Sequence, residues 1–410
     1  MRPSFRLTAS HQPLKPRRRV SARPHQRTGT RTGRRARIVH RRAEDNHRPS
    51  WSLNARPWRR TASAARVLPS LPQSILWRYA CFVTIVSGVY LLYTHLPYYQ
   101  GPQFAAARLV LGLLYVAYLV GGIPFYLVPL LATPRARYDV GSKTLLYLAL
   151  CRQAMSRGGI GRARPRWRFS NRRTKTALLS LGVKGFYLPI MTMYVCRHVT
   201  NLAAHFASFR ASVDFSSWLS ASWYELTLAL LFFVDTAVFT MSYAIESPRF
   251  GSRIKSVEPT LLGCVAALIC YPPFNSLVSA NVVPGELMRA TPWFAHPILL
   301  GGSRVIVIVC DAIFVWASVT LGFRASNLTN RGIVSWGPYR WVRHPAYTVK
   351  LVSFWCEQLP SLTWAGAFVL GFWHVIYFLR AWTEERHLSR DPDYQRYVQA
   401  VRCRFIPRVW

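Results

Sequence analysis

Two short polar stretches near the C-terminus hold the residue types that could do chemistry. The first, 337–347, reads Gly-Pro-Tyr-Arg-Trp-Val-Arg-His-Pro-Ala-Tyr, and the second, 383–388, reads Thr-Glu-Glu-Arg-His-Leu. Each lies at the edge of a strongly apolar segment. Ionisable groups are costly where a chain leaves a bilayer, so a cluster of them there is a candidate functional site. Such groups can bind two reaction partners and hold them in line for a displacement reaction.

The first stretch should form a shaped loop. Gly337-Pro338 predicts a turn after an apolar segment, and Tyr339 and Trp341 suit the headgroup level of a membrane. Pro345 disfavours helical geometry for the residue before it. We therefore expect His344 on a loop, with a new apolar helix beginning near Tyr347.

The second stretch should present its side chains from a helix. Arg380 and Glu384 are four residues apart and share a helix face, whereas the adjacent Glu384 and Glu385 point about 100° apart. One carboxylate can therefore face a bound ligand while the other anchors the neighbouring loop.

A short helix should follow. Asp391-Pro392-Asp393 has the pattern of a helix N-cap with proline in the first turn, and the helix should run to about Val401. Tyr394 and Tyr397 would then point back toward the two polar stretches.

Taken in this order and spacing, Arg343-His344-Pro345-Ala346-Tyr347 and Glu384-Glu385 resemble the signature of the isoprenylcysteine carboxyl methyltransferase and phospholipid methyltransferase superfamily. The resemblance covers about residues 320–410 and includes Arg331-Gly332-Ile333-Val334 ahead of the turn. It implies S-adenosylmethionine as the cofactor. It also implies a lipid-embedded or amphiphilic methyl acceptor, such as a prenylcysteine carboxylate or a phospholipid.

The resemblance also implies roles for individual residues. Expected cofactor contacts are His344, Pro345, Tyr347, Glu385 and Tyr339. Arg380, Glu384 and Arg343 are expected to act on the substrate. The guanidinium groups of the two arginines are candidates to hold an anionic substrate group. Transfer of a methyl group from a sulfonium needs neither a metal nor a covalent nucleophile, and the sequence predicts no metal site.

Two other functions fit parts of the same pattern. A membrane reductase similar to the sterol reductases would bind NADPH with a related Arg-His-Pro and acidic pattern, although here Trp382-Thr383 precedes the acidic pair. A transporter or membrane scaffold would use 337–347 only as an interfacial anchor, and the intramembrane acids Asp235 and Asp311 would suit transport.

The elements that must position these residues are membrane helices. A span needs about 20 apolar residues. Such blocks predict spans at 76–96, 107–132, 177–196, 219–245, 258–280 and 297–323. The apolar region 350–379, interrupted by Gln358-Leu359-Pro360-Ser361, should form a helical hairpin that enters and leaves on one side.

The distribution of Lys and Arg predicts the orientation. Loop 135–176 has twelve Lys/Arg, whereas loops 94–107, 197–218 and 281–296 have none, two and one. We therefore expect loop 135–176, the C-terminal motifs and both termini in the cytoplasm, in a bacterial inner membrane. Ionisable residues within or near spans should pair between helices or line a cavity: Arg78, Arg108, Glu225, Asp235, Arg304, Asp311 and Glu357.

Composition fits an all-α, polytopic integral membrane bundle of about six spans with a C-terminal hairpin and a cytoplasmic cap. Of the 410 residues 51% are hydrophobic, although the net charge is +38. None of the eight cysteines forms a CxxC pair, which argues against a zinc site. The expected domains are a tail (1–70), a five-span bundle (71–296) and a methyltransferase-like membrane domain (297–410).

The segment 1–70 has 19 Lys/Arg against two acids, so we expect a disordered basic tail. It could be a flexible extension that only favours the cytoplasmic side, a lipid-bound tail or a transit peptide. Few aromatic residues interleave with its charges, so we expect no nucleic-acid partner; the bilayer and the acceptor are the expected partners. The sequence gives no indication of the oligomeric state.

Overall fold

The computed structural model describes residues 73–132, 172–212, 214–247, 250–276 and 296–409. Within these ranges the regular secondary structure is helical, apart from one antiparallel pair of two-residue strands, β1 (Ser256–Val257) and β2 (Thr329–Asn330). The prediction of an all-α fold is confirmed. The predicted tail (1–70), most of the basic loop 135–176 and nearly all of loop 281–296 lie outside the described residues.

Among the described residues, five helices are long and apolar enough to cross a membrane, as predicted for a polytopic membrane protein. The apolar stretch Tyr79–His95, inside the predicted span 76–96, is shorter than these five helices and is not among the candidate spans. The five candidate spans are Pro102–Pro124, Arg172–Ala211, Phe215–Ala244, Pro297–Arg324 and Trp364–Leu388.

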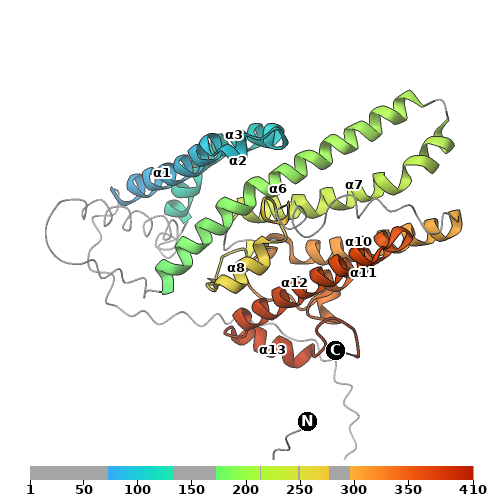
Figure 1. Cartoon of the computed structure of the whole chain (residues 1–410). Helices are drawn as coiled ribbons and strands as arrows, with labels where there is room; N and C mark the ends of the chain where they lie inside the picture. Colours follow the sequence, from blue (N-terminus) through green and yellow to red (C-terminus); the bar gives the residue numbers. More distant parts are fainter. Residues whose placement is uncertain (1–72, 133–171, 213, 248–249, 277–295, 410) are drawn as a thin grey trace, which may run out of the picture. The chain divides into compact units, whose positions relative to one another are not determined.

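The first part of the bundle consists of two helix pairs (Figure 1). α1 (Gln73–His95) packs against α3 (Ala105–Ala132), with the short α2 (Pro97–Gln100) and the 3₁₀ turn η1 (Pro102–Phe104) between them. α6 (Arg172–Ala211) packs along α7 (Phe215–Ala244), which begins at the N-cap Asp214. Buried aromatic side chains fill the space where α3 meets α6, including Tyr93, Phe104 and Tyr187.

The prediction of a spanning helix at 258–280 is wrong. The structure describes there α8 (Leu261–Leu268), whose eight residues are too few to cross a bilayer, and a break at 269–273 separates it from the next helical residues, 274–276. Thr260 caps its N-terminus by accepting a hydrogen bond from the Gly263 amide. The run Tyr271-Pro272-Pro273 follows its end, and proline cannot continue the helical hydrogen-bond pattern.

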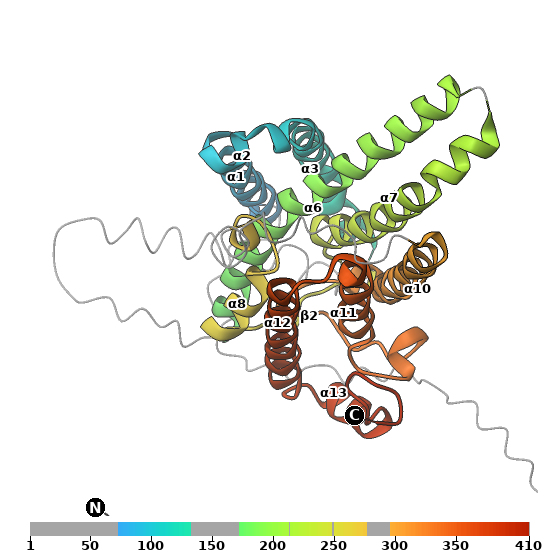
Figure 2. The same cartoon turned by 45° about the vertical axis from the view of Figure 1, so that its right-hand side comes forward.

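The C-terminal part contains a helical hairpin where one was predicted, although its second helix is long and apolar enough to cross a membrane (Figure 2). α10 (Pro297–Leu321) packs against α11 (Pro345–Gln358), and α11 packs against α12 (Trp364–Leu388). The 3₁₀ turn η6 (Leu359–Ser361) separates α11 from α12 at the predicted interruption, and α13 (Pro392–Ala400) is the predicted short helix. α12 continues past the apolar region that ends at 379, and protein groups contact its charged residues Arg380, Glu385 and Arg386.

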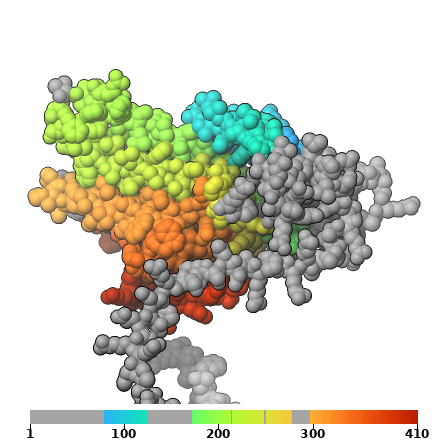
Figure 3. Space-filling model, turned by 180° about the vertical axis from the view of Figure 1, so that it is seen from behind, coloured from blue at the N-terminus to red at the C-terminus, as the bar shows by residue number. Residues whose placement is uncertain are grey.

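α7 and α10 point in the same direction, since their last turns lie together. Ser242 donates a hydrogen bond to the Ala325 carbonyl, and the Tyr243 hydroxyl accepts one of 2.7 Å from the Asn327 amide. Seen from behind, the orange surface around α10 lies between the yellow-green surface of α7 and the red C-terminal segment (Figure 3). The chain must therefore return to the opposite end of the bundle between residues 244 and 297.

Two 3₁₀ turns connect α10 to the polar loop, η4 (Gly322–Arg324) and η5 (Gly337–Arg340). Gly337 has a φ of +61°, and a Cβ there would lie 2.7 Å from the Thr320 hydroxyl. Only glycine accepts both conditions easily. The predicted turn at Gly337-Pro338 therefore packs directly on the end of α10.

Candidate active site

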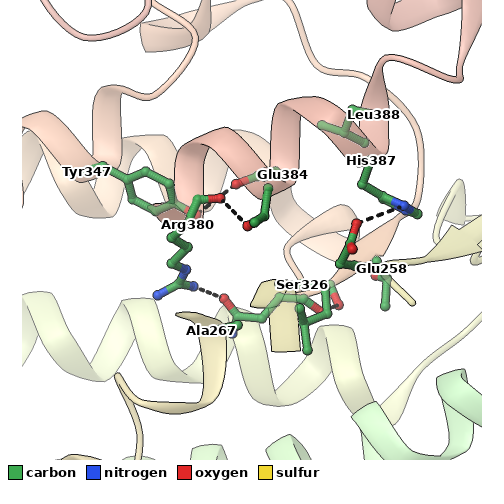
Figure 4. A pocket seen from close by; sticks show the side chains of 13 residues that line it. Glu258, Ala267, Ser326, Tyr347, Arg380, Glu384, His387 and Leu388 are labelled. Atoms are coloured by element: carbon green, nitrogen blue, oxygen red, sulfur yellow. Dashed lines mark hydrogen bonds and ion pairs between the residues drawn. The ribbon is translucent and has the colours of Figure 1, made fainter. Parts of the chain in front are cut away.

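A pocket lies where the ends of α11 and α12 meet α8 and the segment after η4 (Figure 4). Its enclosed space amounts to about 50 Å³. Its wall combines carboxylates, a guanidinium group, aromatic surface and small residues. The lining residues are Glu258, Gly263, Ala267, Ser326, Asn327, Leu328, Thr329, Tyr347, Arg380, Thr383, Glu384, His387 and Leu388.

Glu384 and Arg380 bring opposite charges to the wall of this pocket without pairing with each other. The Tyr347 hydroxyl donates a hydrogen bond of 2.8 Å to Glu384 Oε2. Arg380 donates to the side-chain oxygen of Asn327, and its guanidinium carbon lies 5.2 Å from the centre of the Tyr347 ring. Among the residues that the structure describes, neither charged group has an ion-pair partner within 4.0 Å.

Glu385, one residue further along α12, has a different environment. Its Oε1 accepts from Arg343 Nε at 2.8 Å and lies 3.1 Å from His344 Nε2, while its Oε2 lies 3.1 Å from Arg404 Nε. Only 13% of its side chain is exposed. Charge-assisted hydrogen bonds of this kind are the strong ones, so Glu385 anchors the polar loop to α12.

The same cluster fixes the C-terminal segment. Arg343 Nη1 donates to the carbonyls of Val401 and Arg402, at 3.1 and 2.9 Å. The backbone amides of Arg343 and His344 donate to the carbonyls of Cys403 and Arg404. These contacts use three of the five N–H donors of Arg343 within the protein, so Arg343 holds the polar loop to the C-terminal segment.

His344 connects this anchor to the pocket. It is the N-cap residue of α11, with φ −124° and ψ 56°, so it lies outside the helix as predicted. Its ring stacks on the Tyr347 ring at 5.3 Å with an interplanar angle of 7°. Contacts therefore run from Glu385 through His344 and Tyr347 to Glu384.

Two polar residues of the site, Glu258 and Asn327, were not predicted from the sequence. Glu258 binds the end of α12, since its carboxylate lies 3.0 Å from Arg386 Nη2 and 3.4 Å from His387 Nδ1. Asn327 is the acceptor for Arg380. Glu258-Pro259-Thr260 has the form of a helix start and could have indicated a short capped helix rather than a span. Asn327 has no such signal.

α13 packs over the polar loop. The Tyr397 hydroxyl donates to the Tyr339 carbonyl at 2.7 Å. Asp391 caps α13 and also accepts hydrogen bonds from Asn330 (2.8 Å) and Lys255 (3.1 Å). Burial alone would raise the pKa of Asp391, but these hydrogen bonds outweigh it and lower that pKa.

The structure brings all eight predicted site residues to one end of the bundle, in two groups. Tyr347, Arg380 and Glu384 line the pocket. The others surround the anchor or support it without lining the pocket: Tyr339, Arg343, His344, Pro345 and Glu385.

Comparison with known families agrees with this location. Residues 294–391 match the family model described as phospholipid methyltransferase, which confirms the predicted resemblance and extends it upstream through α10. Searches of curated proteins and of solved structures gave no match. The C-terminal region is thus similar to a family of membrane methyltransferases.

Proposed function

We propose that this chain is an integral-membrane methyltransferase that uses S-adenosylmethionine and methylates a lipid-embedded or amphiphilic acceptor. One observation carries the proposal. Within the region that matches the family, Tyr347, Arg380 and Glu384 converge on a single pocket at the ends of two apolar helices. A soluble cofactor could reach this pocket from water, and a lipid acceptor could reach it from the bilayer.

The chemistry of the pocket fits this cofactor. When bound, S-adenosylmethionine supplies a methyl group on a positively charged sulfur, and it also has a zwitterionic amino-acid end. Glu384 offers an unpaired carboxylate, and the Tyr394 hydroxyl is buried without a hydrogen-bond partner in the described part of the chain. The enclosed space of about 50 Å³ is smaller than the roughly 300 Å³ or more of typical ligand pockets, so binding requires the wall to part.

Each pocket residue then has a task. Glu384 attracts the positive charge of the cofactor, and Tyr347 holds that carboxylate in place through its hydrogen bond. Burial raises the pKa of Tyr347, so its hydroxyl remains a donor at neutral pH. Arg380 retains unused N–H donors and holds an anionic group of the acceptor. Positioning of the two partners is the main source of rate acceleration for such a displacement.

The test is binding followed by transfer. Full-length protein in lipid nanodiscs should bind S-adenosylmethionine in calorimetry and should move a labelled methyl group into the lipid fraction. NADPH should not compete with S-adenosylmethionine. Absence of S-adenosylmethionine binding in every lipid tried would refute the proposal, and binding of NADPH instead would favour the reductase alternative.

A further inference from the structure

Arg380 has more donor capacity than its surroundings use. A guanidinium group has five N–H donors, and among the described residues the one side-chain acceptor for that of Arg380 is Asn327. Its other near neighbours are aromatic faces: the rings of Tyr271, Tyr347 and Tyr377 lie with their centres 5.8, 5.2 and 6.0 Å from its guanidinium carbon. The Arg380 guanidinium group is thus surrounded mainly by aromatic rings and has few hydrogen-bond acceptors.

Lys350, one turn beyond Tyr347 on α11, has the same shortage. Its ammonium lies 4.8 Å from the centre of the Phe314 ring and 5.9 Å from that of Phe354. In the part of the chain that the structure describes, it makes no hydrogen bond and no carboxylate lies within 4.0 Å of it. Asp235 and Asp311 interact with it electrostatically from a greater distance. A lysine ammonium in an apolar setting needs acceptors for its three donors.

The Phe354 ring beside Lys350 lies 6.4 Å from the Tyr377 ring. The centres of the Tyr377 and Tyr271 rings lie 6.0 and 5.8 Å from the Arg380 guanidinium carbon. The Tyr271 hydroxyl accepts a hydrogen bond of 3.1 Å from Asn327, which leaves its own proton free to donate. The Tyr377 hydroxyl has no partner among the described residues, and its ring lies 5.4 Å from that of Tyr347. Two cations and two phenolic donors thus lie around the same group of aromatic rings, and among the described residues the hydrogen-bond acceptor for Arg380 is the Asn327 side-chain oxygen.

We propose that Lys350 and Arg380, together with the hydroxyls of Tyr271 and Tyr377, form a subsite for the anionic group, a phosphate or a carboxylate, of a membrane-embedded ligand. An anion there would satisfy the unused donors, and charge-assisted hydrogen bonds to phosphate or carboxylate are strong. The assignment of this subsite to the methyl acceptor rests on the proposed function. Anion binding itself does not require methyl transfer.

Lipid retention tests the subsite without catalysis. Full-length protein in uncharged maltoside micelles is incubated with dioleoyl phosphatidate, oleate or dioleoylglycerol, and native mass spectrometry measures the bound lipid. At least one anionic lipid should bind tenfold more tightly than dioleoylglycerol, and the preference between phosphatidate and oleate identifies phosphate or carboxylate as the natural group. Equal retention of all three lipids would overturn the inference.

Variants locate the effect. Lys350→Met should lower the ratio of affinities for anionic and uncharged lipid at least tenfold, and Lys350→Arg should restore part of that ratio. Lys175→Met removes an exposed lysine at the start of α6 and should change nothing. The site would be refuted if wild type and Lys350→Met prefer anionic lipid equally and thermal melting shows that both proteins are folded.

Kinetics separate this inference from the proposed function. If the protein transfers methyl groups, Lys350→Met should raise KM for the lipid acceptor at least tenfold and leave the Kd for S-adenosylmethionine unchanged. A weaker Kd for S-adenosylmethionine would instead assign the cations to the cofactor and overturn the inference. Failure of wild-type protein to bind S-adenosylmethionine would refute the proposed function, while the retention experiment would still decide the subsite.

Discussion

Glu384 and Glu385 are adjacent in the sequence, but their carboxylates have opposite surroundings. Glu384 is exposed and accepts one hydrogen bond, from a tyrosine in the pocket wall. Glu385 is nearly buried and contacts two arginines and a histidine. The 100° between neighbouring helix positions causes this division, because it turns one side chain toward the pocket and the other toward the loop.

Glu384→Gln should weaken binding without weakening the fold. Glutamine keeps the size of the side chain and can still accept from Tyr347, but it removes the negative charge. We expect the Kd for S-adenosylmethionine to rise at least tenfold and the free energy of unfolding to change by less than about 0.5 kcal/mol. Calorimetry and unfolding in mixed micelles measure the two quantities. An unchanged Kd would remove Glu384 from the cofactor site.

Glu385→Gln should show the reverse pattern. It leaves the buried Arg343 without its carboxylate, and loss of one partner of a buried ion pair costs about 3 kcal/mol or more. The free energy of unfolding should fall by about that amount. Any loss of cofactor binding should recover at low temperature, where the fold persists. Normal stability with lost binding would instead make Glu385 a direct cofactor contact, the role that the family resemblance implied.

At the residue scale, the sequence predicts which side chains gather but not how they divide the work. The general geometry of helices and the restriction that proline imposes on the preceding residue place His344 off the helix and set Glu384 apart from Glu385. Whether Arg343 faces a ligand or the protein depends on the carbonyls of Val401 and Arg402, which lie more than 50 residues away. Contacts of that range leave no pattern in a local stretch of sequence.

Among the elements, α13 and the strand pair are joined through one carboxylate. Asp391 caps α13 and binds Asn330 of β2 and Lys255, next to β1. Its pKa is lowered in the folded protein, so its contribution to stability is complete above the ordinary value of about 3.9 and is lost as the pH falls through the lower folded value.

Asp391→Asn should therefore remove a pH-dependent part of stability. Asparagine is an equally good N-cap, so the change isolates the charge. The difference in unfolding free energy between wild type and the variant should be constant above pH about 4 and should shrink below it. Unfolding titrations of both proteins between pH 3 and 7 measure this difference. A difference that grows on acidification would contradict the assigned direction of the pKa shift.

The wrong prediction of a span at 258–280 is also explained by contacts between elements. Hydropathy alone makes this segment similar to a membrane helix, but its first residue, Glu258, is needed to bind Arg386 and His387 at the end of α12. The segment thereby becomes a wall of the pocket through Gly263 and Ala267. A tertiary contact decided its structure, whereas length and apolar content correctly predicted the long helices α3, α6, α7 and α10.

Across the whole molecule, the parallel direction of α7 and α10 gathers the site at one end. The ends of both helices meet the segment that carries Asn327, and Asn327 binds Arg380 of the pocket. The turn between α6 and α7 lies at the other end of α7, about 45 Å away for a helix of 30 residues. That distance exceeds the thickness of the hydrocarbon core of a bilayer, about 30 Å.

The two ends should therefore face opposite sides of the membrane, with the site in the cytoplasm. Ala207 near the α6–α7 turn and Gln399 on α13 are both exposed, so a cysteine at either position is accessible. In a background without the eight native cysteines, expressed in bacteria, a membrane-impermeant maleimide should label Ala207→Cys in intact cells and Gln399→Cys only after lysis. Labelling of Gln399→Cys in intact cells would reverse the orientation that the basic loops predict. Labelling of both in intact cells would mean that α7 does not cross, because its two ends would then share one side.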